Sequence, residues 1–396
     1  MPMPELWERS ERLLLPSPTL QPPARHGGEA ACAPQSSEMN VSPTFQDDVS
    51  AGRPSARPLR RLRVVERHGP APAGLSRVAV AFAGLLAAQC GAEVVRVEPP
   101  DGDPMRGWPP YRDGRSALFA FLTRGKTTVD AAWRAGAGDL LLTDDPAAAA
   151  AWPSTRRVLV RPGGDAGAAG LTELTVQARS GLLDIFAGED GQPRPLPGNQ
   201  IAYSAGMAAF DALLAGCLGE RRGHAFPPMT VDVLDVALWV NWKHYLAAVA
   251  GDTAAGLSRV EEWTTLRCKD GHVALTFQDK DMASLATLTG NAYFVSPELA
   301  TRKLRKRNVR ALNEAIEAWT RDRTREEIVR GAQRLRIPVG PVLGMDELAR
   351  DPQLRARAFF VAGETGLTVP RLPLFWNGAP LGRAGAAADV AREAAR

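Results

Sequence analysis

The sequence predicts an α/β fold that begins near residue 60, and three observations indicate it. Residues 62–65 form a short apolar strand pattern, residues 76–90 an apolar helix after a loop with prolines and glycines, and residues 93–98 a second strand. Strand, helix and strand within about 37 residues make a βαβ unit, whose parallel strands require a right-handed crossover. The apolar runs 140–142 and 158–160 indicate further buried strands. Together these elements predict a Rossmann-like large domain.

The later segments predict a second, smaller unit. A helical pattern rich in small residues covers 201–218, and residues 230–238 lead into a helix that carries Trp239, Trp242 and Tyr245. A hairpin is predicted over 265–275, centred on Asp270-Gly271. Helices follow as far as Leu335, and residues 337–342 are predicted to form a buried turn and strand.

Four parts of the chain are therefore expected. Residues 1–59 hold ten prolines and few periodic apolar positions, which predicts a largely extended or disordered segment with a short helix over 5–15. Residues 60–225 are expected to form the Rossmann-like large domain, shortened at 130–180. Residues 226–345 are expected to form a linker and a small α+β domain, and residues 346–396 a return to the large domain with a fraying helix after 384.

Composition excludes several classes of protein. The chain has 396 residues, and its four cysteines are scattered without a CxxC pair, which excludes a disulfide scaffold and a cysteine-rich zinc module. No stretch is expected to reach the roughly 18 apolar residues of a membrane helix. The first charges of the chain are acidic, unlike those of a signal peptide. A cytoplasmic protein without a membrane partner is therefore expected.

The net charge of +4 does not by itself indicate nucleic acid. Of 48 lysine and arginine residues only six are lysines, which is the composition of a GC-rich coding sequence. The one dense basic run, residues 302–307, lacks interleaved aromatic residues and leads into an amphipathic helix pattern. A solvated helix entrance is therefore favoured over a nucleic-acid patch.

Several catalytic motifs are incomplete. Gly125-Lys126-Thr127 ends like a phosphate-binding Walker loop, but Ala120 stands where the first glycine is required. No GxGxxG follows the first strand, and the five histidines do not have metal-ligand spacing, so no metal is expected. Residues 202–206 approximate the GxSxG elbow around Ser204, but the segment before them is no strand. A serine hydrolase that uses Ser204 is the weakest alternative.

A series of motifs carries a family resemblance. The second strand runs into GAEVVRVEPPDGDPMRGW at residues 91–108, and SALF follows at 116–119 and RGK at 124–126. Further matches occur in order at SGLL (180–183), DGQP (190–193), VDV (231–233), DGHV (270–273), IPVGPV (337–342) and ELARDPQL (347–354). The chain resembles the family III CoA-transferases, the CaiB/BaiF family that also contains α-methylacyl-CoA racemases, from about residue 60 to residue 376.

This resemblance implies a fold and a chemistry. It implies a Rossmann-like large domain with a smaller α+β domain, and two interlocked chains. The substrates are acyl-CoA thioesters, with the nucleotide on the large domain. Transferase members use one aspartate, which forms a mixed anhydride with the acyl group and then a CoA thioester, so that acyl exchange is split into two easier steps.

The chain departs from the family at the decisive place. The aspartate of the family lies in the pattern G-x-x-I-A-D-x-x-A-G, whereas residues 198–206 read GNQIAYSAG, and Tyr203 stands where the aspartate is expected. The histidine that racemases carry about thirty residues upstream is absent from residues 177–180. A phenol with an unperturbed pKa near 10 is a poor nucleophile and forms no anhydride. A second departure is the short, alanine-rich stretch between Asp130 and Gly181.

The resemblance and its gaps name the candidate site residues. Arg106 and Lys126 match positions where cations would pair with CoA phosphates, and Asn199 is a third CoA-binding candidate. Tyr203 is the catalytic candidate by position, while Asp184 and Glu189 are candidate substitute carboxylates, although turn and helix-end charges are the favoured interpretation of both. Trp108, Trp239 and Trp242 are expected in the core.

Two hypotheses about function stay open beside the serine hydrolase. The first is a CoA-transferase family enzyme with altered or displaced catalytic machinery, working as a homodimer. The second is a non-catalytic subunit of a heteromeric CoA-transferase, whose partner would be a paralogue that keeps the aspartate.

Overall fold

The computed structural model describes residues 57–70, 74–164, 171–187, 190–251, 264–363 and 366–382. Most of the predicted extended segment 1–59, the short helix over 5–15 and the helix after residue 384 lie outside these described residues.

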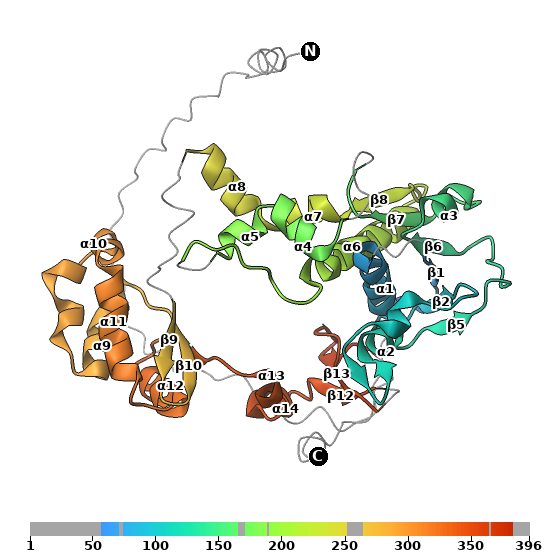
Figure 1. Cartoon of the computed structure of the whole chain (residues 1–396). Helices are drawn as coiled ribbons and strands as arrows, with labels where there is room; N and C mark the ends of the chain where they lie inside the picture. The colour runs from blue at the N-terminus through green and yellow to red at the C-terminus, as the bar shows by residue number, and fades with distance from the viewer. Residues whose placement is uncertain are drawn as a thin grey trace, which may run out of the picture. The chain divides into compact units, whose positions relative to one another are not determined.

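A six-stranded parallel sheet organises the first half of the described chain (Figure 1). Its strands are β1 (Arg63–Arg67), β2 (Glu93–Val97), β5 (Thr127–Val129), β6 (Leu140–Thr143), β7 (Arg157–Arg161) and β8 (Met229–Asp232). Their order is β5-β2-β1-β6-β7-β8, and every pairing is parallel. The chain thus winds outward from β1 in one direction and then from β6 in the other, the doubly wound arrangement. The predicted α/β fold is confirmed, and the sheet runs on past residue 225 into β8.

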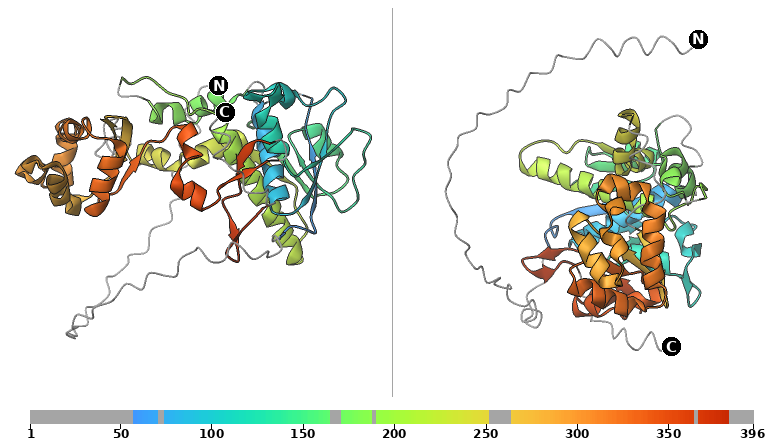
Figure 2. Two further views of the ribbon diagram at one scale, coloured as in Figure 1. Left: turned by 90° about the horizontal axis from the view of Figure 1, so that it is seen from below. Right: turned by 90° about the vertical axis from the view of Figure 1, so that its left-hand side faces the viewer.

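Helices cover the sheet and carry most of its core. They are α1 (Gly74–Gln89), α2 (Ala117–Thr123), α3 (Pro146–Ala151), α4 (Glu173–Arg179), α5 (Leu182–Ile185), α6 (Gln200–Arg221) and α7 (Val233–Val240). The next helix, α8 (Trp242–Val249), has no buried residue and adds nothing to this core. Helices α1 and α6 lie against each other (Figures 1 and 2). Their close approach requires Gly206, because a Cβ there would lie 2.7 Å from the Ala79 carbonyl oxygen.

Helix α6 contradicts one expectation from the sequence. It has 22 residues and contains an 18-residue stretch with a mean hydropathy of 1.5, so it is long and apolar enough to cross a membrane by length and composition. Its Ala205, Ala209 and Leu213 are fully buried in the same core as α1 and the sheet. Small, apolar residues are needed on a helix that packs this closely, so the composition of α6 is also that of a core helix.

The connection from β5 to β6 is short. Residues 130–139 cross from one edge strand of the sheet to the far side of β1 without a helix. This stretch falls in the region that the sequence predicts to be shortened. A small 3₁₀ helix η2 (Pro104–Gly107) and the two-stranded ribbon of β3 (Tyr111–Arg112) and β4 (Arg115–Ser116) lie instead in the preceding connection, from β2 to β5.

A second hydrophobic core belongs to residues 264–341. The antiparallel sheet β11-β10-β9 is built from β9 (Thr264–Cys268), β10 (Gly271–Leu275) and β11 (Val339–Pro341). The helices of this unit are η3 (Asp279–Asp281), α9 (Met282–Thr289), η4 (Ala292–Val295), η5 (Pro297–Leu299), α10 (Arg302–Arg307), α11 (Val309–Thr320) and α12 (Arg325–Arg334). Leu266, Leu285 and Leu312 are among the buried residues of this core. The hairpin predicted at Asp270-Gly271 is confirmed.

The last described elements are short. They are α13 (Met345–Leu348), α14 (Pro352–Ala356) and the hairpins of β12 (Phe360–Ala362) with β13 (Thr368–Pro370) and β14 (Phe375–Trp376) with β15 (Ala379–Pro380). Leu372 and Leu381 are buried in the core of the parallel sheet. The C-terminal part of the described chain therefore contributes to that first core.

The tryptophans of α7 and α8 contradict their prediction. Trp239 is 76% exposed and Trp242 54% exposed, whereas Trp108 packs against the core as predicted. Leu238, Tyr245 and other apolar side chains of the same two helices are also exposed. An apolar helix pattern in the sequence does not distinguish a face buried within one chain from a face that is left open.

Candidate functional site

Arg106 lies on η2, just after the carboxyl end of β2, and Glu98 holds it in place. Its Nε and Nη2 donate to the two carboxylate oxygens of Glu98 at 2.6 and 2.7 Å. The guanidinium lies over the ring of Phe119 from α2, 4.4 Å from the ring centroid. The side chain is nevertheless 54% exposed. Glu98 and Phe119 therefore fix the orientation of the Arg106 guanidinium, while about half of the side chain stays exposed and accessible to a ligand.

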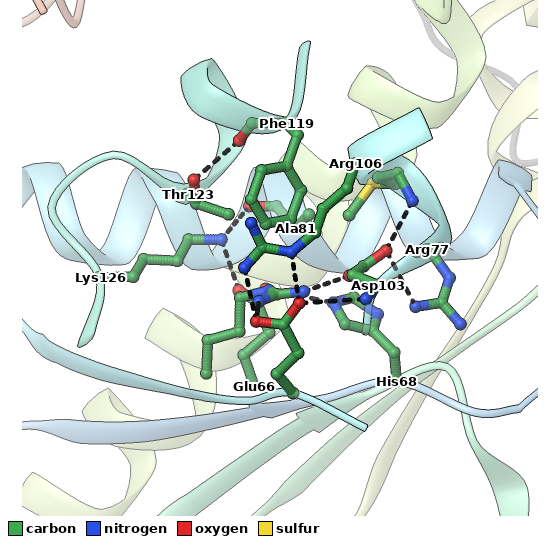
Figure 3. A network of polar contacts seen from close by, with 12 residues as sticks. Glu66, His68, Arg77, Ala81, Asp103, Arg106, Phe119, Thr123 and Lys126 are labelled. Atoms are coloured by element: carbon green, nitrogen blue, oxygen red, sulfur yellow. Dashed lines mark hydrogen bonds and ion pairs between the residues drawn. The ribbon is translucent and has the colours of Figure 1, made fainter. Parts of the chain in front are cut away.

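Lys126 is placed differently from the prediction. Its ammonium donates to Glu66 Oε2 at 2.5 Å and to the Ala81 carbonyl at 2.7 Å, and its side chain has no exposed surface (Figure 3). A Cβ at position 84 of α1 would lie 2.1 Å from Glu66 Oε2, so Gly84 makes room for this ion pair. Because the ammonium is enclosed and donates to Glu66 and Ala81, Lys126 belongs to a buried network.

Asp103 forms the second centre of this buried network. Its carboxylate accepts a hydrogen bond from Arg96 Nη2 and lies 3.4 Å from Arg77 Nη1. All three side chains are almost wholly buried. The Glu66 carboxylate lies 3.7 Å from Arg96 Nε, so the two centres are joined. Buried charges of this kind are tolerated because each has a partner of opposite sign.

His68 extends the buried network to the carboxyl edge of the sheet. Its Nε2 lies 3.2 Å from Glu66 Oε1, and its Nδ1 lies 3.6 Å from Asp144 Oδ1. Asp144 also accepts the Gly69 amide hydrogen at 2.8 Å. This contact joins the segments that follow β1 and β6, at the edge of the sheet where doubly wound folds commonly bind ligands.

The network shifts the titration of its members. Burial raises the pKa of the Glu66 carboxyl, but the Lys126 ammonium and the His68 imidazole outweigh burial and hold that pKa below its ordinary value. Burial lowers the pKa of His68, yet Asp144 and Glu66 together raise it above its ordinary value. The hydrogen bonds from Arg106 lower the pKa of Glu98 to about 2. Glu66 and Glu98 therefore remain ionised at neutral pH.

Tyr203 lies in the first turn of α6, where its half-buried side chain packs against the first core. Its ring contacts Phe82 of α1, with the ring centroids 5.0 Å apart, and the side chain belongs to the edge of the first core. Ser204 donates its hydroxyl to the Gln200 carbonyl at 2.9 Å inside the same helix. Residues 190–199, directly before α6, form no strand, so Ser204 lacks the strand-to-helix turn that a nucleophile elbow requires.

The first turn of α6 is capped by a carboxylate from another helix, which was not predicted from the sequence. Glu173 of α4 accepts the amide hydrogens of Ile201 at 2.7 Å and of Ala202 at 3.2 Å. Asn199 is the residue before the helix and makes no capping hydrogen bond with its side chain. Glu173 therefore caps the start of α6, and the side chain of Asn199 does not. No local signal shows this, because Glu173 precedes the capped amides by 28 and 29 positions.

The segment at the start of α6 is also one residue shorter than the family pattern. Counted from Ile201, the aspartate of the pattern falls on Tyr203, and counted back from Gly206 it falls on Ala202. Ala202 is fully buried. Neither residue carries a carboxylate.

Of the two candidate substitute carboxylates, only Asp184 lies within the described residues. Asp184 of α5 is exposed and lines an apolar groove of about 1030 Å³ together with Trp239, Trp242 and Tyr245. Glu189 lies outside the described residues.

A cavity of about 740 Å³ lies beside Arg106. Its polar lining includes the arginines Arg106, Arg112, Arg115 and Arg124. Phe119 and Phe121 of α2, with Leu367 and Val369 near the hairpin β12–β13, supply apolar surface. The cavity is therefore basic on one side and apolar on another, a combination suited to an amphipathic anion.

The chain belongs to CoA-transferase family III, whose family model matches residues 75–134 and 161–388. It is 25% identical over 374 residues to a succinate–glutarate CoA-transferase of Agrobacterium fabrum, covering 82% of this chain and 90% of that protein. It is 26% identical over 393 residues to a succinyl-CoA–D-citramalate CoA-transferase of Chloroflexus aurantiacus, covering 85% of this chain and 94% of that protein.

Solved structures share the fold. A CaiB/BaiF family protein from Brucella suis superposes with a TM-score of 0.69 at 20% identity, covering 86% of this chain and all of that one. A hypothetical protein from Mycobacterium tuberculosis superposes with a TM-score of 0.67 at 21% identity, covering 84% of this chain and 98% of that one. The family predicted from the sequence is thus confirmed, and with it a function connected with acyl-CoA.

Proposed function

We propose that this protein binds an acyl-CoA thioester and takes part in the transfer of CoA between an acyl-CoA and a carboxylate. The observation that carries the proposal is the family match, which extends over both hydrophobic cores. The two relatives are named for transfer between dicarboxylates, so we propose a short dicarboxylic acyl group and use succinyl-CoA as the first probe.

The chemistry of such a transfer requires a carboxylate nucleophile. A carboxylate oxygen attacks the thioester carbonyl, the C–S bond breaks, and CoA leaves as the thiolate. The thiolate then attacks the enzyme's carbonyl in the mixed anhydride, which releases the first acyl group as a free acid and leaves CoA on the enzyme as a thioester. The acceptor carboxylate attacks this thioester, and the same two steps in reverse return the enzyme's carboxylate and form the new acyl-CoA. At the start of α6 this chain offers Tyr203 in place of a carboxylate, with its ring packed on Phe82.

The second candidate function is that of a non-catalytic subunit in a heteromeric CoA-transferase. Two observations favour it: the packed Tyr203 ring, and the exposed apolar surface formed by α7 and α8. Exposed apolar surfaces of this kind commonly mark protein contacts. We propose that an interlocked second chain covers this surface, either a second copy or a paralogue that bears the aspartate.

We also propose the domain organisation and the cellular location of the protein. The doubly wound strand order supports a Rossmann-like large domain, with a small α+β domain within residues 226–345 and a C-terminal return from residue 346. The four scattered cysteines support a cytoplasmic location.

Binding and transfer are tested separately. CoA at about a hundred times its Kd should stabilise the folded protein by roughly 2.7 kcal/mol, measured as a thermal shift. Exchange of label between succinyl-CoA and free labelled succinate measures transfer. Binding without exchange, followed by exchange after addition of an aspartate-bearing paralogue, is the result expected for the non-catalytic subunit. No thermal shift at millimolar CoA would contradict the proposed function.

The variant Tyr203→Phe distinguishes a packing role of the Tyr203 ring from a role of its hydroxyl in the reaction. We expect the exchange rate of the active assembly to stay within a few-fold, because the ring contact with Phe82 is kept. If the hydroxyl were a general acid or base, its removal would lower the rate by about 10²–10⁴. We expect Tyr203→Asp not to restore exchange in the isolated chain, since a misplacement of about 1 Å can cost about a hundredfold. Exchange in this variant would show that the rest of the site is intact.

A further inference from the structure

Glu173 of α4 is held at the start of α6 by hydrogen bonds from two helices. Its Oε1 accepts the Ile201 amide hydrogen at 2.7 Å, and its Oε2 accepts the Ala202 amide hydrogen at 3.2 Å. The side-chain amide of Gln177, one turn further along α4, donates to Oε1 at 3.4 Å. The carboxylate therefore lies at the turn in which the family pattern has its aspartate, although another helix supplies it.

The buried side chain of Gln177 fixes this arrangement. Gln177 is 1% exposed, its Nε2 donates to the Leu196 carbonyl at 3.1 Å, and its Oε1 accepts the Leu196 amide hydrogen at 2.9 Å. These two bonds connect α4 to the segment that leads into α6. Because Gln177 also donates to Glu173, the same amide helps to determine where the carboxylate lies. A carboxylate held in this way is preorganised for a reaction.

The two oxygens of Glu173 are bonded unequally. Among the described residues, Oε1 accepts from Ile201 and Gln177, whereas Oε2 accepts from Ala202 alone. Within the same described residues Glu173 has no ion pair with a lysine or an arginine. Glu173 is half-buried, so part of its surface is accessible. Since a carboxylate has about four lone-pair sites, Oε2 keeps capacity for a further partner.

This bonding suits both steps of CoA transfer. Attack by Oε2 on a thioester leaves Oε1 as the carbonyl oxygen of the mixed anhydride, beside the Ile201 amide. When the CoA thiolate then attacks the carbonyl carbon of Glu173, negative charge develops on Oε1. A backbone N–H at about 2.7–3.1 Å stabilises such an oxygen, and the N-terminus of the 22-residue α6 adds a favourable dipole.

We propose that Glu173 is the carboxylate nucleophile of this protein, in place of the aspartate that its sequence lacks. The inference rests on the first form of the proposed function, in which this chain itself transfers CoA. The alternative is that Glu173 serves only as a helix cap, which a carboxylate at this position also explains.

The proposed steps balance in atoms and charge. Oε2 attacks the carbonyl carbon of the acyl-CoA, the C–S bond breaks, and CoA leaves as the thiolate. The thiolate attacks Cδ of Glu173, the Cδ–Oε2 bond breaks, and the acyl group leaves as a free carboxylate that carries Oε2. A glutamyl-CoA thioester remains on Glu173. The acceptor carboxylate reverses the two steps, restores Glu173 with one of its own oxygens and forms the new acyl-CoA.

A trap on the unchanged full chain tests this proposal. The protein is incubated with succinyl-CoA and then treated with borohydride, which reduces an enzyme–CoA thioester to an alcohol and leaves free carboxylates unchanged. Peptide mass spectrometry locates the reduced residue. Tryptic cleavage after Arg157 and Arg179 gives a peptide that contains Glu173 but neither Asp184 nor Glu189. We expect the alcohol at Glu173 after incubation with succinyl-CoA, and none without it.

Two variants distinguish a nucleophile from a helix cap. Glu173→Gln keeps an acceptor for the Ile201 amide but has no carboxylate, so we expect exchange of label between succinyl-CoA and succinate to fall by about 10³-fold or more. Glu173→Asp keeps a carboxylate that is drawn back by one methylene. Because a misplacement of about 1 Å can cost about a hundredfold, we expect its exchange to lie between those of Glu173→Gln and the parent. The CoA affinity of both variants, measured by titration calorimetry, should stay within a few-fold.

The matched control is Glu327→Gln, the same substitution at another helix cap. Glu327 Oε2 accepts the Thr324 amide hydrogen at 2.8 Å at the start of α12. Its exchange rate should equal that of the parent. Circular dichroism checks that each variant is folded, and if Glu173→Gln does not fold, the borohydride trap on the parent still decides.

The outcomes separate this inference from the proposed function. An alcohol at Glu173, together with loss of exchange in Glu173→Gln, supports the nucleophile. Exchange that persists in Glu173→Gln, or an alcohol at another residue, overturns it and leaves the proposed function standing. CoA binding without exchange and without a reduced residue also overturns the nucleophile, and favours the non-catalytic subunit. Absence of both CoA binding and exchange overturns both proposals.

Discussion

Two neighbouring groups of charged side chains in this protein differ in burial and in how their charges are paired. The buried network around Glu66 and Asp103 pairs each charge with a partner and has almost no exposed side-chain surface. The cavity beside Arg106 is lined by four arginines, of which Arg106, Arg112 and Arg115 are exposed. The ion pair between Arg106 and Glu98 connects them, because Arg106 lines the cavity and Glu98 also accepts a hydrogen bond from the buried Arg96 at 3.3 Å. The difference teaches that burial decides whether a cation is a structural partner or is available to a ligand.

The largest expected effect comes from breaking the buried network. Lys126→Met removes the ammonium that lies 2.5 Å from Glu66, and we expect a loss of about 3–5 kcal/mol of stability, because a carboxylate is left buried with too few partners. Urea unfolding measures the loss. Arg350→Met, on the surface, should change stability by no more than about 0.5 kcal/mol.

A double variant tests whether this loss comes from the unpaired charge. Glu66→Gln combined with Lys126→Met should be more stable than Lys126→Met alone, since a neutral side chain is less costly to bury than a lone carboxylate. Equal stability of the two proteins would mean that packing around Lys126, rather than its charge, stabilises this region.

An intermediate effect is expected where the two groups of charges meet. The pKa of Glu98 is lowered from its ordinary 4.5 to about 2, so the unfolded chain binds a proton more readily than the folded chain in this interval. The stability contributed by Glu98 is therefore present above pH 4.5 and is lost as the pH falls towards 2. Arg106→Gln should flatten this part of the stability curve, measured by urea unfolding at a series of pH values. An unchanged slope would contradict the assignment of the shift to Arg106.

The smallest effect is expected in the basic cavity, and its sign is opposite. Arg115→Gln removes the like-charge pair with Arg112 and should raise stability by about 0.2–1 kcal/mol at low salt. The gain should shrink at high salt, because exposed charges are screened. A loss of stability would show that Arg115 has a structural role and would weaken the contrast with Lys126.

The sequence predicted the elements well where the pattern is local. The predicted strand 93–98 corresponds to β2 (Glu93–Val97), the predicted helix 201–218 to α6 (Gln200–Arg221), and the predicted helix 76–90 to α1 (Gly74–Gln89). Each has an uninterrupted apolar or small-residue period, so its neighbours in sequence are enough to define it. The hairpin at Asp270-Gly271 was predictable for the same reason.

The candidate site was predictable only in part. Arg106 follows from a motif next to a strand end, and it lines a cavity. Lys126 comes from an equally good motif, yet its partner Glu66 lies 60 positions away, and no spacing rule shows that the two meet. Glu173 was missed because the amides that it caps are 28 and 29 positions later.

By itself, the sequence determined the family and the succession of strands and helices, because ordered motifs and periodic apolar residues are properties of the chain read in one dimension. Only the tertiary structure decided which charged side chains are enclosed and which remain open. Lys126 and Arg106 are both cations of the connection between β2 and β5, but α1 and the sheet cover the first, while the second lies at the rim of a cavity. The physical reason is that burial and charge pairing depend on segments that meet only after the chain has folded.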